Sequence, residues 1–391
     1  MEFVELANKD NLIEIKLKGR IDSTNSESIE KEITECVQNQ HSEVVLDAEK
    51  LEYISSAGLR VILRLRKNEP TLKVINASSE VYEIFEMTGF TEMIPVSKAY
   101  RTLSVEGCEQ IGQGANGIVY RLDPDTIIKV YRNPDSLDEI HNERELARKA
   151  FIYGIPTAIP YDVVKVGNSY GSVFELLNAK SFAKLITEEP NNLDKYIKEA
   201  VDLLKKIHST DVKQEDMPDM KEVAVDWVKF LVDYLPEDKH NKLTKLVNDV
   251  PVVHKMLHGD FHFKNIMLQN GEVLLIDMDT LCQGHPIFEF GGIYNAYQGF
   301  GDMNHENIES FLGIKYEQAK KIFEESVRLY LNTDDDNKIS ELREKAKLIG
   351  YTRLLRRTIK KATNIDDVKE QVEFYKKGLI ELIDKVDTLL F

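Results

Sequence analysis

The chain has 391 residues, of which 42% are apolar, and its formal net charge at pH 7 is −16. This length exceeds what one hydrophobic core usually supports, so two or three domains are expected. The negative charge argues against nucleic acid or an anionic membrane as the main partner, and the lack of a long apolar run or a basic, apolar leader predicts a cytoplasmic protein.

The first hundred residues alternate short apolar strands with amphipathic helices. Aliphatic runs predict strands at residues 12–17, 44–46 and 72–75. Apolar residues at helical spacing predict helices at residues 29–37, 59–65 and 81–85. This alternation predicts an α/β domain over residues 1–100, in which helices pack on a sheet.

Two adjacent serines, Ser55 and Ser56, lie between a predicted strand and a predicted helix, in the stretch Leu51 to Leu59. They therefore fall at a helix N-terminus. There a hydroxyl can cap free backbone N–H groups, and the same donors favour a phosphate. On spacing alone a helix cap is the simpler interpretation, and phosphorylation is the alternative.

Residues 1 to about 100 resemble the STAS domain of anti-sigma-factor antagonists. The stretches that carry the resemblance are Gly19-Arg20-Ile21-Asp22, Leu46-Asp47, Leu51 to Leu63, and Phe85 to Phe90. In that family a serine in an Asp-Ser-Ser-Gly-Leu stretch is the phosphorylated switch, and the resemblance places it on Ser56. Ser55 stands where the family commonly has Asp, and Ala57 where it often has Ser. The resemblance also implies an anti-sigma-like protein as a partner.

A domain boundary is expected near residues 97–106, where a new strand-like segment begins. The second domain opens with the glycines Gly112, Gly114 and Gly117 in a GxGxxG pattern. Glycines let the backbone approach phosphates closely. In a dinucleotide-binding domain a helix would follow, but Ile118 to Leu122 is typical of a strand, which favours a hairpin over the phosphates of a nucleotide.

A single lysine, Lys129, lies within the apolar strand predicted from Thr126 to Tyr131. A buried ammonium needs an anionic partner, which ATP phosphates and a carboxylate would supply. Glu143 lies on the apolar face of the helix predicted from Asp138 to Phe151 and is the expected partner. Glu145 is the second choice, and two exposed carboxylates unrelated to Lys129 are the third interpretation.

The stretch Leu257 to Leu268 reads Leu-His-Gly-Asp-Phe-His-Phe-Lys-Asn-Ile-Met-Leu, and a strand ending at Asp277 follows it. Phosphoryl transfer needs a carboxylate near the attacking hydroxyl and oxygen ligands that hold Mg²⁺ against the ATP phosphates. Asp260 can fill the first role. Asn265 and Asp277 can fill the second, because a hairpin would return the strand beside the loop.

Residues 105 to about 300 resemble the aminoglycoside phosphotransferase and choline kinase group, whose catalytic loop reads His-Gly-Asp with Asn five positions beyond the Asp. This resemblance implies an α+β bilobal protein-kinase-like fold over residues 105–391, with an N-lobe of about 105–177 and a C-lobe of about 178–391. It implies that Asp260 is the catalytic base and that Asn265 and Asp277 bind Mg²⁺.

The same resemblance assigns the nucleotide contacts. The phosphates of ATP would be held by Gly112, Gly114, Gly117 and Lys129. Lys129 would be paired with the helix glutamate. The segment Val173 to Leu177 resembles the connection between the lobes, whose backbone at Glu175 and Leu177 would bind adenine. The family's Gly-Asp-Pro and Asp-Leu motifs are replaced here by Gly284-His285-Pro286 and Glu289-Phe290, a modest departure. The resemblance therefore does not identify the acceptor.

Between Tyr351 and Ala362, the basic residues Arg353, Arg356, Arg357 and Lys360 recur at helical spacing. A solvated face is the simplest interpretation, and an anionic substrate or the other domain is the alternative. A pocket rich in acidic groups would instead indicate a cationic acceptor.

The expected function is ATP- and Mg²⁺-dependent phosphoryl transfer to a hydroxyl of a small molecule, coupled to a STAS regulatory domain. The alternative is a protein kinase that phosphorylates Ser56 of its own or a partner's STAS domain. A third hypothesis, a nucleotide-binding module with little turnover, is disfavoured because a pure binder has no need of the carboxylate at Asp260.

Overall fold

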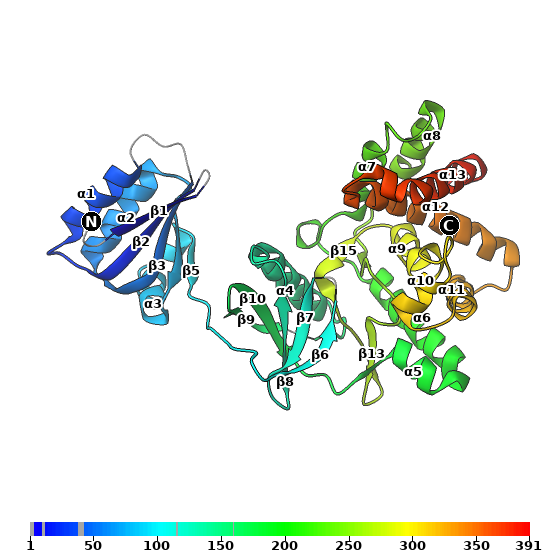
Figure 1. Ribbon diagram of the computed structural model, residues 1–391, viewed down its shortest axis with the longest axis horizontal. Helices are drawn as coiled ribbons and strands as arrows, with labels where there is room; N and C mark the ends of the chain where they lie inside the picture. The colour runs from blue at the N-terminus through cyan, green and yellow to red at the C-terminus, as the bar shows by residue number, and fades with distance from the viewer. Residues whose placement is uncertain (1–3, 10–11, 38–42, 115, 159) are drawn as a thin grey trace. The chain divides into compact units, whose positions relative to one another are not determined.

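The computed structural model describes residues 4–9, 12–37, 43–114, 116–158 and 160–391. The chain divides into two compact units, Met1–Ser104 and Val105–Phe391, each of which has its own hydrophobic core (Figure 1).

The first unit is a five-stranded sheet in the order β1-β2-β3-β4-β5, with one antiparallel pair, β1 and β2, and parallel pairs beyond it. Its strands are β1 Val4–Lys9, β2 Leu12–Ile21, β3 Glu43–Ile54, β4 Lys73–Ala77 and β5 Val96–Lys98. Its α-helices are α1 Ser26–Val37, α2 Ser56–Asn68 and α3 Ser79–Met87. The predicted α/β class is confirmed, and the three predicted strands appear as β2, β3 and β4.

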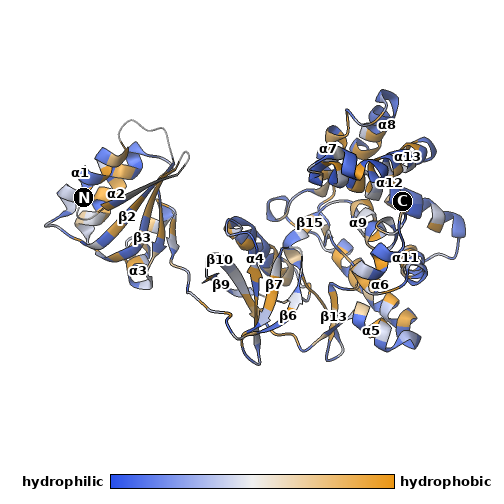
Figure 2. Ribbon diagram, viewed as in Figure 1, coloured by the Kyte–Doolittle hydropathy of each residue, from blue (hydrophilic) through white to orange (hydrophobic). Residues whose placement is uncertain are grey.

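The burial of side chains along the strands agrees with their positions in the sheet. In β2 the alternate residues Ile13, Ile15 and Leu17 are buried, so one face of the strand packs on the core. In the central strand β3 every residue from Val44 to Ala48 is buried, as expected for a parallel strand covered on both faces. Figure 2 shows the apolar residues of this unit gathered on its strands and helix α2.

The second unit begins with an antiparallel sheet in the order β6-β7-β8-β10-β9. Its strands are β6 Glu109–Gln113, β7 Gly117–Arg121, β8 Thr126–Tyr131, β9 Pro160–Val166 and β10 Ser169–Glu175. Helix α4, Leu137–Ile152, lies between β8 and β9 in the chain and contacts both β9 and β10. This sheet and helix position Lys129 and Glu143.

Helices make up most of the remaining chain. They are α5 Phe182–Glu188, α6 Leu193–Ser209, α7 Met220–Phe230, α8 Glu237–Asn248, α9 Pro286–Tyr294, α10 Glu306–Leu312, α11 Tyr316–Leu331, α12 Asp336–Lys361 and α13 Lys369–Lys385. Among the helices that the structure describes, none has the length and apolar character needed to cross a bilayer.

Short strands among these helices hold the segment that the sequence marks as catalytic. Strands β11 Lys180–Ser181, β13 Ile266–Gln269 and β14 Glu272–Leu275 form one small sheet, and β12 Met256–Leu257 pairs with β15 Cys282–Gln283. The turn between β13 and β14 has positive φ at both Asn270 (52°) and Gly271 (86°), which is the two-residue hairpin turn that the sequence predicts.

A buried carboxylate joins three of the helices. Asp302 accepts hydrogen bonds from the hydroxyls of Tyr294 in α9 (2.6 Å), Tyr316 in α11 (2.8 Å) and Tyr351 in α12 (2.7 Å). Burial and the charge of Asp302 raise the pKa of all three phenols, so they remain donors at neutral pH. This cluster fixes α12 against the body of the unit.

Candidate active site

The glycine-rich segment is a hairpin between β6 and β7, closed by a hydrogen bond from Gly114 N to Gly117 O (2.9 Å). A Cβ atom at Gly117 would lie 2.5 Å from Val130 O, so only glycine fits there. A Cβ atom at Gly114 would meet no heavy atom within 4 Å. Gly112 and Gly114 line the cleft, and the open space beside Gly114 is where phosphates could lie; Ala115 is outside the described residues.

Lys129 is the centre of a cluster of charged groups. Its Nζ lies 2.9 Å from Glu143 Oε1 and 3.1 Å from Asp277 Oδ1. Tyr131 supports the pair by donating its hydroxyl to Glu143 Oε2 (2.5 Å). Glu145, by contrast, has a side chain that is 56% exposed and lies 3.8 Å from Arg148. The structure therefore pairs Lys129 with Glu143.

The charge of Lys129 is stable. Burial acts to lower its pKa, but the carboxylates of Glu143 and Asp277 outweigh burial and raise the pKa above its ordinary value. A permanent ammonium beside the glycine hairpin can bind phosphate oxygens, and its exposed fraction of 17% limits competition from water.

The loop that carries Asp260 is held by hydrogen bonds to its backbone. Glu289, at the start of α9, accepts from the N–H groups of His258 (2.5 Å) and Gly259 (3.0 Å), and Tyr297 OH accepts from Phe263 N (3.0 Å). Gly259 has φ of +82°, and a Cβ atom there would lie 2.3 Å from Thr280 O. This loop therefore has one well-defined path, and Asp260 is displayed at its surface.

Asp260 is an ionised acceptor. Burial acts to raise its pKa, but a hydrogen bond from His262, together with the charges of the nearby histidines and Arg353, outweighs burial and lowers the pKa to about 2. His262 Nε2 lies 3.3 Å from Asp260 Oδ2, and Asn265 Nδ2 donates to the backbone oxygen of Asp260 (3.0 Å). The carboxylate, 43% exposed, can accept a hydrogen bond from an incoming hydroxyl.

Asp277 lies beside this loop because the β13–β14 hairpin returns the chain, and Ile276 N donates to Asn265 O (3.0 Å). Its φ of +66° is unusual for a residue other than glycine and marks a strained position of the kind found at functional sites. Asn265 and Asp277 offer an amide oxygen and a carboxylate, which are oxygen ligands that suit Mg²⁺.

Further negative charge lies close to Asp277. Burial, followed by the charges of Asp277 and Glu143, raises the pKa of Asp279 to about 7. Asn116 in the glycine hairpin donates to Asp279 Oδ2 (3.3 Å). A divalent cation would relieve the repulsion among these carboxylates, so the donor set fits a magnesium ion.

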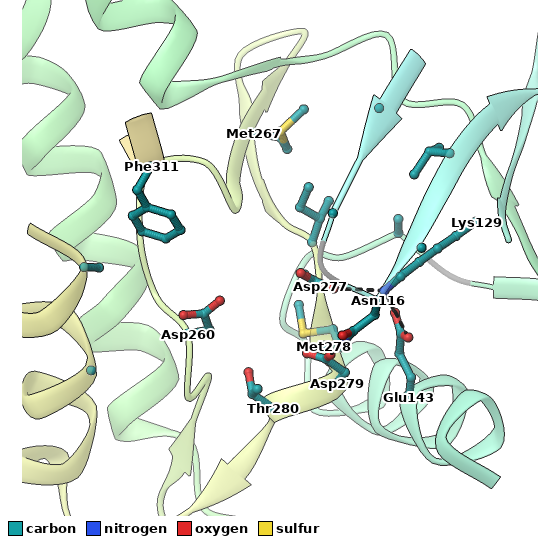
Figure 3. A pocket seen from close by; sticks show the side chains of 18 of the residues that line it. Asn116, Lys129, Glu143, Asp260, Met267, Asp277, Met278, Asp279, Thr280 and Phe311 are labelled. Atoms are coloured by element: carbon teal, nitrogen blue, oxygen red, sulfur yellow. Dashed lines mark hydrogen bonds and ion pairs between the residues drawn. The ribbon is translucent and has the colours of Figure 1, made fainter. Parts of the chain in front are cut away.

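One cleft of about 1690 Å³ is lined by the three glycines of the hairpin, Lys129, Glu143, Asp260, Asp277 and Asp279. Figure 3 shows Lys129 close to Glu143 and Asp277, with Asp260 and Phe311 on the other side of the view. The segment that includes Glu175 and Leu177 lines the cleft as well. The structure therefore gathers the predicted nucleotide residues, Asp260 and Asp277 around one cleft, whereas the buried Asn265 does not line it and instead contacts Asp260.

One side of the cleft was anticipated only in part, because sequence reasoning singled out Arg353 and Arg357 but not the other residues that line it. We call it the helical wall, defined as the cleft-lining residues between Gly292 and Tyr375, and it includes Phe300, Arg357 and Lys361. Of the predicted basic helix, Arg353 and Arg357 line the cleft, whereas Arg356 and Lys360 do not. The spacing Arg353, Arg357 and Lys361, four residues apart, is the signal that could have found this face.

In the first unit, the two serines have different roles. Ser55 is the N-cap of α2, and its hydroxyl oxygen accepts from Ala57 N (3.2 Å) and Gly58 N (3.4 Å). Ser56 is the first helical residue and is exposed. The cap that the sequence predicts is therefore Ser55, which leaves the Ser56 hydroxyl at the surface.

The fold and cleft of the second unit define a bilobal phosphotransferase of the protein-kinase type. Residues 107–320, more than half of the chain, match the model of the phosphotransferase enzyme family, and the chain belongs to that family. It is therefore an enzyme that transfers a phosphoryl group to an alcohol. Residues 4–104 match the model of the STAS domain.

Curated relatives match the first unit. A putative anti-sigma factor antagonist, BtrV, from Bordetella bronchiseptica is 37% identical over 94 residues, which are 23% of this chain and 81% of that protein. An anti-sigma-B factor antagonist from Staphylococcus aureus is 23% identical over 99 residues, covering 24% of this chain and 92% of that protein. The first unit is thus a STAS domain of the anti-sigma-factor-antagonist type.

Solved structures match the second unit in fold. A thermostable mutant of aminoglycoside phosphotransferase APH(4)-Ia, in complex with ADP and hygromycin B, has a TM-score of 0.50 and 12% identity over 72% of this chain and 94% of that one. ADP-bound APH(2'')-Ib has a TM-score of 0.50 and 13% identity over 77% and 98% of the two chains.

Proposed function

We propose that the second unit transfers the γ-phosphoryl group of ATP, bound with Mg²⁺, to a hydroxyl of a small molecule, and that the STAS unit regulates this reaction. The observation that carries the proposal is the shared cleft. It holds the Lys129–Glu143 ion pair, Asp277 and the ionised Asp260 beside the glycine hairpin.

Each group in the cleft has a role in this proposal. Gly112, Gly114 and Gly117 let the backbone of the hairpin approach the ATP phosphates, and Lys129 neutralises part of their charge. The backbone at Glu175 and Leu177 binds adenine, supported by their position on the cleft. Bound ADP in the structural neighbours supports a nucleotide donor.

Asn265 and Asp277 would hold the magnesium ion, which when bound neutralises charge on the phosphates. Asp260 hydrogen-bonds the acceptor hydroxyl and takes its proton. The hydroxyl oxygen forms a bond to the γ-phosphorus as the bond between this phosphorus and the bridging oxygen of ADP breaks. The products are the phosphorylated acceptor and ADP.

This proposal places the N-terminal domain at residues 1–100 and the kinase-like domain at 105–391. The sheet β6 to β10 with α4 would form the N-lobe, to about residue 177, and the helical remainder would form the C-lobe. An anti-sigma-like protein is the proposed partner of the STAS unit, supported by its curated relatives.

The test is incubation of the purified chain with Mg²⁺ and γ-labelled ATP, alone and with a panel of hydroxylated compounds. Label in a small molecule, with unlabelled protein, is the expected result. Hydrolysis or binding of ATP without transfer to any compound or protein would contradict the proposal. Omission of Mg²⁺ should abolish the transfer.

A second candidate is a protein kinase that phosphorylates Ser56 of this chain or of a partner. The observation that favours it is the exposed Ser56 hydroxyl, which is free of the capping role that Ser55 fills. In the same assay, label in the protein that disappears in Ser56→Ala but persists in the matched variant Ser23→Ala would support this candidate. Label that persists in Ser56→Ala would rule it out.

A further inference from the structure

The helical wall differs in charge from the rest of the cleft. Glu143, Asp277 and Asp279 gather around Lys129, and Asp125 and Glu175 lie near the segment between the lobes. Among the described residues of the helical wall, by contrast, three cations line the cleft and no carboxylate does. The cations are Arg353, Arg357 and Lys361, which share one face of α12.

These cations have no close anionic partner, although the more distant charges of Asp260 and Glu289 act on Arg353. In the part of the chain that the structure describes, none of the three side chains forms an ion pair or a hydrogen bond with another residue. Arg353 lies over the ring of Trp227 and Arg357 over the ring of Phe300, each 5.7 Å from the centroid. By comparison, Arg343 on the same helix pairs with Glu324 at 3.1 Å.

The carboxylates of the neighbouring helices do not contribute to the helical wall. Glu306 in α10 and Glu370 and Glu373 in α13 are exposed, and none of them lines the cleft. In a chain with a net charge of −16, three cations without a carboxylate beside them on the helical wall are a local reversal of charge.

A chain of contacts places these cations on the acceptor side. Asp260 lies 3.3 Å from His262, and the ring of His262 packs on Phe311 with 5.1 Å between centroids. Phe311 in turn packs on Phe300 at 5.3 Å, and Arg357 lies over the ring of Phe300. Arg353 reaches the catalytic loop more directly. A Cβ atom at Gly292 would lie 3.5 Å from Arg353 Nη1 and 3.6 Å from Gly259 O.

The nucleotide phosphates do not account for this positive charge. Lys129 and the glycine hairpin already offer a cation and open backbone to the phosphates. Arg353 is also half-buried, which a simple solvated helix face does not explain.

We infer that the acceptor is an anionic hydroxyl compound, one whose carboxylate or phosphate group is bound by Arg353, Arg357 and Lys361 while its hydroxyl faces Asp260. This inference rests on the proposed function and goes beyond it by assigning the charge of the substrate. It distinguishes the chain from an enzyme for cationic amines, which would need carboxylates on this wall.

The test uses four related sugar compounds that carry different charges: glucose, gluconate, glucose 6-phosphate and glucosamine. The full chain is first saturated with Mg²⁺ and a non-hydrolysable ATP analogue, so that the phosphate-binding hairpin is occupied. Trp227 is the only tryptophan of the chain and contacts Arg353, so its fluorescence reports binding at the helical wall.

We expect gluconate or glucose 6-phosphate to bind at least about tenfold more tightly than glucosamine. Comparison of the two anions then shows whether the helical wall prefers a carboxylate or a phosphate. Arg357→Gln and Lys361→Gln should each weaken that binding about fivefold, as expected for loss of one partly screened ion pair. Lys360→Gln, on the same helix but off the cleft, is the matched control and should leave binding unchanged.

Tighter binding of glucosamine than of both anions, or equal anion binding by Arg357→Gln and the unchanged chain, would overturn the inference. Failure of the proposed function has a different signature. A chain that binds no nucleotide contradicts both the proposed function and the inference about the acceptor. A chain that binds nucleotide and phosphorylates glucosamine, but phosphorylates neither anion, contradicts only the charge assigned to the acceptor.

Discussion

Asp260 is held in place by its own loop. His262 and Asn265 contact it from two and five residues further along the chain, and the loop backbone is fixed by Glu289 and Tyr297. The side chain needs no further support from the nucleotide, because the glycine hairpin and Lys129 are separate from these contacts. Catalysis and nucleotide binding can therefore be separated by mutation.

In Asp260→Asn, we expect the turnover number to fall by ~10²–10⁴-fold, because an amide cannot accept the hydroxyl proton. The affinity for Mg²⁺ and ATP should stay within about threefold of the original value, because Asp260 is not among the proposed phosphate contacts. Steady-state kinetics and direct nucleotide titration measure the two quantities. Full turnover in this variant would remove Asp260 from the catalytic role.

The partner of Lys129 can be tested with a matched pair of variants on one helix. Glu143→Gln removes the charge that holds Lys129, whereas Glu145→Gln changes an exposed residue whose nearest cation is Arg148. We expect the KM for ATP to rise about tenfold in Glu143→Gln, a loss of ~1.4 kcal/mol, and to change little in Glu145→Gln. Equal effects in both variants would show that the ion pair is not used.

At the scale of elements, the backbone around the site depends on two glycines in the left-handed region. Gly259, before Asp260, would place a Cβ atom 2.3 Å from Thr280 O, whereas Gly271 in the β13–β14 turn has similar φ and open space around it. The two positions share the same backbone strain for alanine and differ only in crowding.

For Gly271→Ala, we expect the free energy of unfolding to fall by ~1–2 kcal/mol, the cost of the left-handed conformation alone. Gly259→Ala should cost at least about 2 kcal/mol more, because the loop must also move away from Thr280, and its turnover should fall with it. Denaturant unfolding of both variants gives the difference. Equal stabilities would mean that the loop accommodates the extra atom freely.

Elements with strong local signals could be predicted from the sequence. Strands β2, β3 and β4 have aliphatic runs, helix α4 has a clear apolar face, and the turn at Asn270-Gly271 has the residues that it requires. Strand β1 was missed because Val4–Lys9 mixes apolar and polar residues, and β5 because Val96–Lys98 has only three residues. Short edge strands are defined by pairing with a neighbour more than by their own composition.

The residues of the cleft likewise divide into those with a local sequence signal and those without one. Lys129, Asp260, Asn265 and Asp277 lie in recognisable local motifs, so the sequence was sufficient to select them. Phe300 and Phe311 line the same cleft as Tyr375, which lies more than 60 residues further along the chain, only because of tertiary packing that no local pattern encodes.

At the scale of the whole molecule, two separate cores predict two unfolding steps. Among the described residues, the core of the first unit runs from Val4 to Ile94 and that of the second from Leu146 to Leu389, with no residue in common. In calorimetry we therefore expect two transitions, of which only one should shift with Mg²⁺ and a non-hydrolysable ATP analogue.

At 100 times its dissociation constant, the analogue should stabilise the kinase-like unit by about 2.7 kcal/mol and leave the STAS transition unchanged. Lys129→Met is the control and should remove most of the shift. A single transition that moves as a whole with the nucleotide would show that the two units unfold cooperatively.

The tyrosine hydroxyls that converge on Asp302 hold α12 from its buried side, away from Arg353, Arg357 and Lys361. Side chains on the cleft side of this helix can therefore be exchanged while its backbone stays in place. Substitutions on this face of α12 are therefore expected to change which acceptor binds, while the residues proposed for phosphoryl transfer keep their positions.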